Sequence, residues 1–296
     1  MRPRPLTIAA WLLLAALVPA ALFFPVEQRE EAARETVVRI WNVDTFEGGK
    51  GSRTAFLRRV AALAEQKQKG VLYNVTSYTE EGVREAFARG ETPDILSFGI
   101  GMGDVFSLLS DTEGTEPVPW CCGAYYLFSL TDDLPERGAP DGSVALSAGG
   151  ANFPEASAYF AGIEGEKVQS LSAYLGFLSG EYDFLLGTQR DVCRFQSRGV
   201  TVYSRLLPAY CDLMQYVAVL RTEHSACSGF VGTLLSEEVQ AELYTIGMYP
   251  AKSAQGRTAP PLCSGEELRR NVQKLCAGNA ERELDALFPA VRSGAK

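Results

Sequence analysis

Two carboxylates, an aromatic ring and an arginine closely follow the strand-like apolar run at residues 37–40, in the stretch WNVDTFEGGKGSR. These residues are Asp44, Glu47, Phe46 and Arg53. Carboxylates accept hydrogen bonds from hydroxyl groups, and an aromatic ring can cover an apolar sugar face. Open α/β sheets bind ligands at the carboxyl ends of their strands. The stretch therefore predicts one wall of a ligand-binding cleft, with a helix-capping turn and solvated charges as the structural alternative.

The glycines of the same stretch favour phosphate binding less. Gly48, Gly49 and Gly51 precede an expected helix N-terminus, where anions bind well. Their spacing fits neither GxxxxGK[ST] nor GxGxxG. The two neighbouring carboxylates would also repel a phosphate, so a phosphate cradle is disfavoured.

Catalytic chemistry has little support elsewhere in the chain. The single histidine, His224, lies in the helix-like stretch TEHSACSG, and a Ser–His or Cys–His pair would need it. No GxSxG elbow is present. The acidic pairs at 80–81 and 237–238 fall in expected first turns of helices, which favours a capping role. We expect a non-enzyme without cofactor or metal; a glycoside hydrolase using two carboxylates is a minor alternative.

The elements that would position the opening stretch alternate between strands and helices. Apolar runs at 36–43, 71–78 and 95–99 read as strands. Between them, Ser52 and Thr79 can cap helices that Gly70 and Gly90 close. Strand, helix, strand, helix, strand with short joints is typical of a parallel α/β unit. VPWCCGAYYLFSL, residues 118–130, reads as one long buried strand.

Four stretches, in this order, resemble one protein family. They are IWNVDTFEGGKGSRTAFL, GETPDILSFGIG, VPWCCGAYYLFSL and FVGTLLSEEVQAELYTIGMYPA. Together they are similar to the extracellular solute-binding proteins of bacterial ABC importers, in the group that includes many sugar binders. LLGTQRDV is also similar to a segment of that family, but departs from it at Arg190 and Asp191. The resemblance covers residues 37–250.

The resemblance implies an α/β, periplasmic-binding-protein-like fold with two lobes, a hinge and a ligand cleft between the lobes. Lobe one would comprise residues 37–117 and 222–250. The hinge and lobe two would comprise residues 118–221 and 251–296. A strand that crosses between the lobes would be supplied by 118–130.

Five further candidate site residues follow from this arrangement. Ser97 and Phe98 end the third strand beside the opening stretch, and Trp120 and Tyr125 lie on the hinge-like run. The alternative for these four is a packed turn or plain core. Arg190 follows a glycine-led turn and is a candidate for the opposite wall, with a local ion pair to Asp191 as its alternative.

The N-terminal residues are typical of an export signal. Arg2 and Arg4 precede an uncharged run from Pro5 to Val26. Residues 1–26 are either a signal peptide cut before Ala21 or a retained membrane anchor, and 27–36 would form a stalk. Positive charge before the run places the rest of the chain outside the cytoplasm, at the extracellular face of the membrane or secreted.

Charge and cysteine content limit the partners. The formal net charge of −8 disfavours nucleic-acid binding. The seven cysteines match no zinc spacing and read as buried packing with one or two disulfides, for which Cys263 and Cys276 are a candidate pair. We expect the adjacent Cys121 and Cys122 to be packed in the interior rather than to form a redox site.

These observations predict an extracellular solute-binding component of an ABC importer. It would hold a small polar ligand, with a carbohydrate as the first guess, and would deliver it to membrane permease subunits. A ligand-sensing or scaffold protein of the same fold without transport is the alternative.

Overall fold

The computed structural model describes residues 36–109, 116–221 and 225–291. The predicted signal peptide or anchor, 1–26, and the stalk up to residue 35 lie outside the described residues. Within the described part of the chain, no helix is both long and apolar enough to cross a membrane.

A six-stranded sheet forms the first lobe. Its spatial order is β11 (Tyr249–Pro250), β4 (Val118–Cys122), β10 (Met214–Val219), β3 (Ile95–Gly99), β1 (Thr36–Val43) and β2 (Val71–Tyr78). β1 and β3 run parallel, whereas β10 is antiparallel to both β3 and β4. The sheet is therefore mixed, with a parallel part that ends at the opening loop after β1.

The first helices form as the sequence predicts. Ser52 caps α2 (Arg53–Lys67) by accepting a hydrogen bond from the backbone N of Ala55. Thr79 caps α3 (Glu80–Ala88) in the same way, accepting from the backbone N of Gly82. The strand–helix–strand–helix–strand order predicted for residues 36–99 is confirmed.

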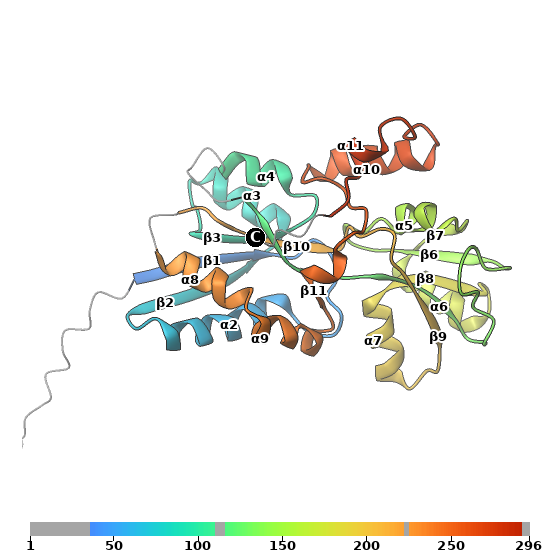
Figure 1. Cartoon of the computed structure of the whole chain (residues 1–296), viewed down its shortest axis with the longest axis horizontal. Coiled ribbons are helices and arrows are strands. Elements are labelled where there is room, and N and C mark those ends of the chain that lie inside the picture. Colours follow the sequence, from blue (N-terminus) through green and yellow to red (C-terminus); the bar gives the residue numbers. More distant parts are fainter. Residues whose placement is uncertain (1–35, 110–115, 222–224, 292–296) are drawn as a thin grey trace, which may run out of the picture. The chain divides into compact units, whose positions relative to one another are not determined.

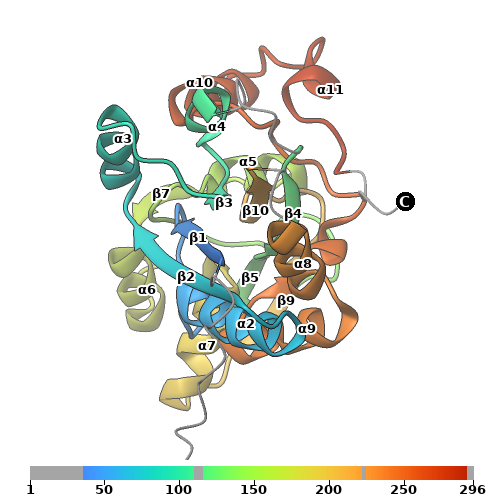
Figure 2. The same ribbon diagram turned by 90° about the vertical axis from the view of Figure 1, so that its left-hand side faces the viewer.

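Alternate side chains of β1 are buried on opposite faces of this sheet. Val38 and Ile40 belong to the core that contains the apolar side of α2. Trp41 and Val43 belong to a second core beside α3 and α4 (Gly103–Leu109). Figures 1 and 2 show α2, α8 (Ser225–Leu234) and α9 (Glu237–Ala241) on one face of the sheet, with α3 and α4 on the other.

A five-stranded sheet forms the second lobe. Its order is β7 (Glu166–Gln169), β6 (Val144–Ala148), β8 (Phe184–Thr188), β5 (Tyr125–Ser129) and β9 (Tyr203–Leu207). One face packs against α5 (Pro154–Ala161) and the other against α6 (Ser170–Ser179) and α7 (Gln189–Arg198). β7 ends at Gln169, and α6 begins at the next residue.

The run at 118–130 is two strands, and the prediction of one long strand is wrong. The chain leaves the first sheet after Cys122 and enters the second sheet at Tyr125. At the break, the backbone N of Ala124 donates to Oε1 of Gln189 (3.0 Å), and a Cβ on Gly123 would lie 2.5 Å from that oxygen. Gln189 therefore holds the chain where it changes sheets.

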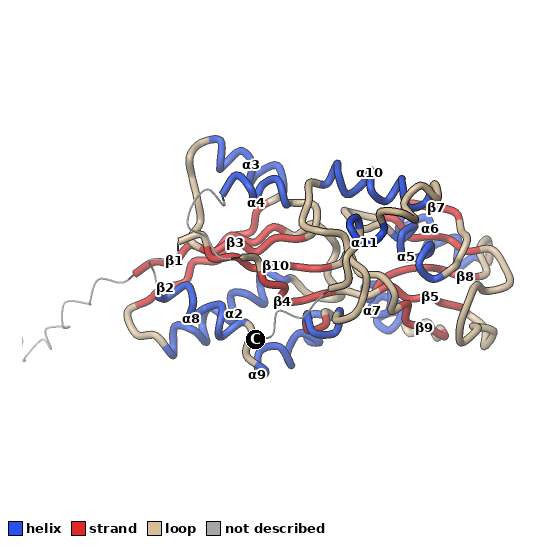
Figure 3. Tube along the Cα trace, turned by 45° about the horizontal axis from the view of Figure 1, so that its top comes forward, coloured by secondary structure: helices blue, strands red, loops and turns tan. Residues whose placement is uncertain are grey.

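The chain returns between β9 and β10, through residues 208–213. Figure 3 shows the strands of the two sheets in red with the connecting loops in tan. The predicted two-lobed α/β fold is confirmed by these two sheets and their crossings. The two ends of the range predicted as hinge and second lobe, β4 and β10, are strands of the first sheet.

The C-terminal part touches both lobes. It contains η1 (Glu242–Ile246), β11, η2 (Ala251–Ala254), α10 (Gly265–Cys276) and α11 (Leu284–Leu287). Just before α10, the carbonyl of Cys263 accepts a hydrogen bond from the backbone N of Gly103 (3.0 Å), in the first lobe. α10 itself packs against α5 of the second lobe. Segment 251–291 thus spans the two sheets.

All seven cysteines are free in this structure. The candidate pair Cys263 and Cys276 stands on either side of α10. A helix of that length separates its ends by about 18 Å, whereas a disulfide needs Cα atoms within about 7 Å. The pairing predicted from the sequence is therefore wrong.

Candidate ligand-binding cleft

The opening loop after β1 meets a loop of the second lobe. The backbone N of Ala151 donates a hydrogen bond to the carbonyl of Thr45 (3.0 Å). Ala151 belongs to the loop 149–153, which joins β6 to α5. The carboxyl ends of β1 and β6 therefore face each other across the space between the lobes.

A small cavity lies between these two loops. Its volume is about 10 Å³, enough for one water molecule. Phe46 and Glu47 line it from the first lobe. The second lobe and the returning segment contribute Ser147, Gly149, Asn152, Ser170, Thr188, Arg190, Asp191 and Leu213. The two lobes are therefore in near contact here.

An ion pair closes one side of this cavity. Arg190 of α7 pairs with Glu47 of the opening loop, and both side chains are partly exposed. Thr188 caps α7 in a reciprocal capping box with Asp191, and Asp191 also pairs with Arg194 (3.2 Å). Because Asp191 is engaged with these partners, Arg190 reaches across the cleft. Arg190, the candidate for the opposite wall, thus pairs across the cleft with Glu47, and the alternative of a local ion pair with Asp191 is not what forms.

A larger cavity of about 500 Å³ opens beside the small one. The first lobe lines it with Thr45, Glu80, Ile100 and Gly101. The second lobe contributes Ala148 to Phe153 and Lys167, and α10 contributes Gly265, Leu268 and Arg269. Gly149 and Asn152 border both cavities, so the two cavities lie next to each other between the lobes. A volume of this size suits a small-molecule ligand.

Asp44 and Arg53 shape the opening loop from inside. Arg53 is buried, with 1% of its side chain exposed, and its Nε donates to Oδ1 of Asp44 (2.8 Å). The guanidinium also donates to the carbonyl of Phe46 and lies 4.0 Å from the centre of the Phe46 ring. This arrangement fixes Phe46 at the cleft, while neither charged group lines the cavities described above.

Ser97 and Trp120 belong to a buried hydrogen-bond network under the first sheet. Oγ of Ser97 donates to Oδ1 of Asn42 (2.8 Å) and accepts from Nε1 of Trp120 (3.2 Å). Nε2 of Gln215 donates to the same Oγ (3.1 Å), and the Trp120 ring stacks on Phe56. Both predicted site residues are fully buried.

Phe98 and Tyr125 are also buried. Phe98 stacks between Phe106 and Tyr216 in the core beside α4. Tyr125 donates its hydroxyl to Oδ1 of Asp212 (2.8 Å), and neither ring lines the two cavities. The structure thus brings Phe46, Glu47 and Arg190 together at the cleft, with Asp44 and Arg53 supporting them. It places the other four candidates in the interior.

Asp212 and the loop 149–153 were not predicted from the sequence as parts of the site. Asp212 is fully buried in the returning segment, and its Oδ2 accepts from the backbone N of Phe153 (2.8 Å). Burial raises the pKa of Asp212 to about 7, although hydrogen bonds from Tyr125 and Phe153 oppose the shift. The Gly149–Gly150 pair directly after a strand was the available signal for the loop; Asp212 carried none.

The described residues contain no group of three or more histidine, cysteine and acidic side chains that could hold a metal ion. The polar groups that line the cleft are instead hydroxyl, amide and charged side chains. This chemistry suits hydrogen bonding to a polar organic ligand.

Of the comparisons with known proteins, only the one with solved structures found similar proteins. No protein-family model and no curated protein sequence matches the chain. The periplasmic sulfonate-binding protein SsuA from Methylobacillus flagellatus KT is similar with a TM-score of 0.44 and 18% identity, over 74% of each chain.

Two other similar structures have TM-scores of 0.49 and 13% identity. Substrate-binding domain 2 of GlnP from Lactococcus lactis, in the open conformation, matches over 72% of this chain and 94% of its own. The GacH receptor of Streptomyces glaucescens, described unliganded and with acarbose, matches over 85% and 96%. One description names sulfonate and another names acarbose, so this similarity does not identify a ligand.

Proposed function

We propose that this chain is the extracellular solute-binding component of an ABC importer. It would bind a small polar ligand between its lobes and present it to membrane permease subunits. The observation that carries the proposal is the cavity of about 500 Å³ that both lobes line, next to the small cavity bordered by the ion pair of Glu47 and Arg190. Ligands that contact both sides of such a cleft stabilise the closed arrangement by hinge motion.

A carbohydrate is the first ligand class to test. Ser147, Asn152 and Thr188 offer neutral hydrogen-bonding groups along the cleft, and Phe46 and Phe153 offer rings beside them. Hydroxyl-rich ligands use this combination of polar and aromatic contacts. The sequence resemblance to the sugar-binding group of these importers supports the same class.

The test is a thermal-shift screen of the purified chain against sugars, amino acids, polyamines and inorganic anions. A compound that binds only the folded state raises the melting temperature by mass action. Titration calorimetry then gives the affinity of each hit. We expect a sugar to shift the transition; a shift by another class would retain the binding role and correct the ligand.

Two neighbouring arginines provide a matched control. Arg269 lines the large cavity, whereas Arg270 is exposed and is not among its lining residues. Arg269→Ala is expected to weaken binding of a hit, and Arg270→Ala to leave it unchanged. If the full panel leaves the melting temperature unmoved, the importer proposal gives way to the scaffold alternative.

A further inference from the structure

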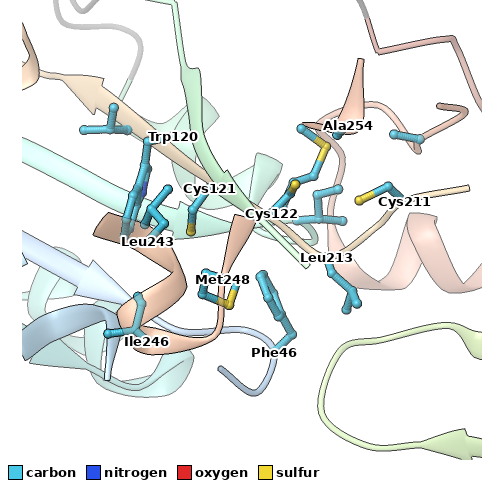
Figure 4. Packing of buried hydrophobic residues seen from close by; sticks show 14 of the residues in the cluster. Phe46, Trp120, Cys121, Cys122, Cys211, Leu213, Leu243, Ile246, Met248 and Ala254 are labelled. Atoms are coloured by element: carbon cyan, nitrogen blue, oxygen red, sulfur yellow. The ribbon is translucent and has the colours of Figure 1, made fainter. Parts of the chain in front are cut away.

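Two cysteine thiols meet where the chain passes between the sheets. Cys122 ends β4, directly before the first crossing, and Cys211 lies in the second crossing, residues 208–213. Sγ of Cys211 lies 3.6 Å from the carbonyl oxygen of Gly123, the residue that follows Cys122, and the Cys122 thiol is close enough to affect the pKa of Cys211. Both side chains are fully buried. Figure 4 shows them among the buried residues of this region.

The backbone holds the two crossings side by side. The backbone N of Gly123 donates to the carbonyl of Leu213 (2.6 Å), and Met214 is paired with Cys122 in the antiparallel ladder of β4 and β10. Cys211 lies three residues before Met214, so these contacts hold it beside the end of β4, where its thiol meets the carbonyl of Gly123. The two cysteines are therefore close neighbours at the crossings, as a cross-link requires.

We propose that Cys122 and Cys211 form a disulfide when the chain folds in an oxidising environment, so that the bond joins the two crossings. A small-molecule disulfide such as glutathione disulfide is the oxidant. One cysteine thiolate attacks it, forms a mixed disulfide and releases one glutathione thiolate. The second cysteine thiolate then attacks the protein sulfur of the mixed disulfide and releases the other glutathione. Two electrons pass to the glutathione, and the two thiol protons leave to solvent or to the released thiolates.

This thiol–disulfide exchange can take place while the chain is folding. In the folded chain, the contact with Cys122 and burial hold the pKa of the Cys211 thiol well above its ordinary value. Since the thiolate is the reactive form, the buried pair reacts slowly once packed. The bond would limit how far one crossing moves against the other. A consequence for lobe closure rests on the proposed function, whereas formation of the bond does not.

The experiment is refolding of the reduced, denatured full chain in a buffer of reduced and oxidised glutathione. Free thiols are then alkylated in denaturant, and the digest is analysed by mass spectrometry with fragmentation. We expect a linked peptide pair joining Cys122 to Cys211, which disappears after reduction with dithiothreitol. The oxidised chain should also melt at a higher temperature than the reduced chain.

Cys121→Ser is the matched control, because Cys121 is the buried neighbour of Cys122 on the same strand. This variant should retain the linked peptide and the melting difference, and Cys211→Ser should lose both. If a variant fails to fold, fragmentation of the wild-type peptide still decides between Cys121 and Cys122. Complete alkylation of Cys122 and Cys211, a different partner for either, or a persistent glutathione adduct would overturn the proposal. None of these readouts uses a ligand, so they are independent of the importer test.

Discussion

Asp212 is a buried carboxyl group that connects Tyr125 at the start of the second sheet with the cleft loop at Phe153. Its pKa is about 7 in the folded chain, against an ordinary value of 3.8. Between these pH values the folded state binds more protons than the unfolded state. The free energy of unfolding should therefore fall as the pH rises from 4 to 7, by up to about 4 kcal/mol from this group.

The substitution Asp212→Asn should remove this contribution because an amide does not titrate. Urea denaturation at pH 5, 6, 7 and 8 measures the effect on the free energy of unfolding. The loss of stability towards pH 7 should be smaller in the variant than in the wild type. Asp104→Asn serves as the control, since Asp104 is partly exposed and its pKa is lowered. Equal pH slopes for wild type and Asp212→Asn would contradict the prediction.

Trp120 is expected to stabilise the fold through its packing. It is fully buried, stacks on Phe56 and donates to Ser97. Trp120→Ala should reduce the free energy of unfolding by about 3 to 5 kcal/mol. Leu171→Ala, at a side chain that is 56% exposed, should change it by less than about 0.5 kcal/mol. Urea denaturation of both variants checks this, and a loss for Trp120→Ala no larger than the control's would refute it.

Residue types predicted only part of the candidate site. Phe46, Glu47 and Arg190 were found because charged or aromatic groups stood next to glycine-rich strand ends. Trp120 and Tyr125 have the same chemistry, yet their rings face the interior. An apolar run does not reveal which face of a strand borders a cleft, since that depends on the partner strands. The role of Asp212 could not be predicted without the fold, because its partners lie 87 and 59 residues away in the sequence.

The opening loop is an element fixed by close backbone contact. A Cβ on Gly49 would lie 2.2 Å from the carbonyl oxygen of Gly247, and the backbone N of Lys50 donates to the carbonyl of Ile246. Gly49→Ala should therefore displace the loop and destabilise the fold by about 1 to 3 kcal/mol. The measurement is the free energy of unfolding in urea.

Gly232 provides the control for this substitution. It lies in α8, and an added Cβ would meet no atom within 4 Å. Gly232→Ala should stabilise the chain by up to about 1 kcal/mol, because alanine favours helix. The prediction for the loop fails if Gly49→Ala is as stable as Gly232→Ala.

Local patterns predicted most elements but missed where the chain changes sheets. Caps at Ser52 and Thr79 and the periodic helix of residues 53–67 followed from neighbouring residues alone. The break at Gly123 depends on Gln189, which lies 65 residues from the adjacent Ala124. A continuous apolar run contains no local signal for such a contact, so one strand was predicted where two form.

At the scale of the whole molecule, the ion pair of Arg190 and Glu47 influences the separation of the two lobes. Its charges are 33% and 49% exposed, so it should contribute less than about 1 kcal/mol to folding. Its influence on lobe separation can be larger, since the free-energy difference between the open and closed arrangements is itself small. Arg190→Glu would place two like charges across the cleft. We expect a larger radius of gyration by small-angle X-ray scattering in the absence of ligand.

A charge swap separates this effect from a general loss of structure. The double variant Glu47→Arg, Arg190→Glu restores attraction and should return the radius of gyration to the wild-type value. Arg84→Glu breaks a pair with Asp104 that lies within the first lobe, so it should leave the radius unchanged. The expansion in Arg190→Glu should also shrink as salt screens the repulsion. If Arg190→Glu and Arg84→Glu scatter alike, the pair between the lobes has no part in holding the cleft closed, and other contacts between the lobes, such as the hydrogen bond of Ala151 with Thr45, hold it.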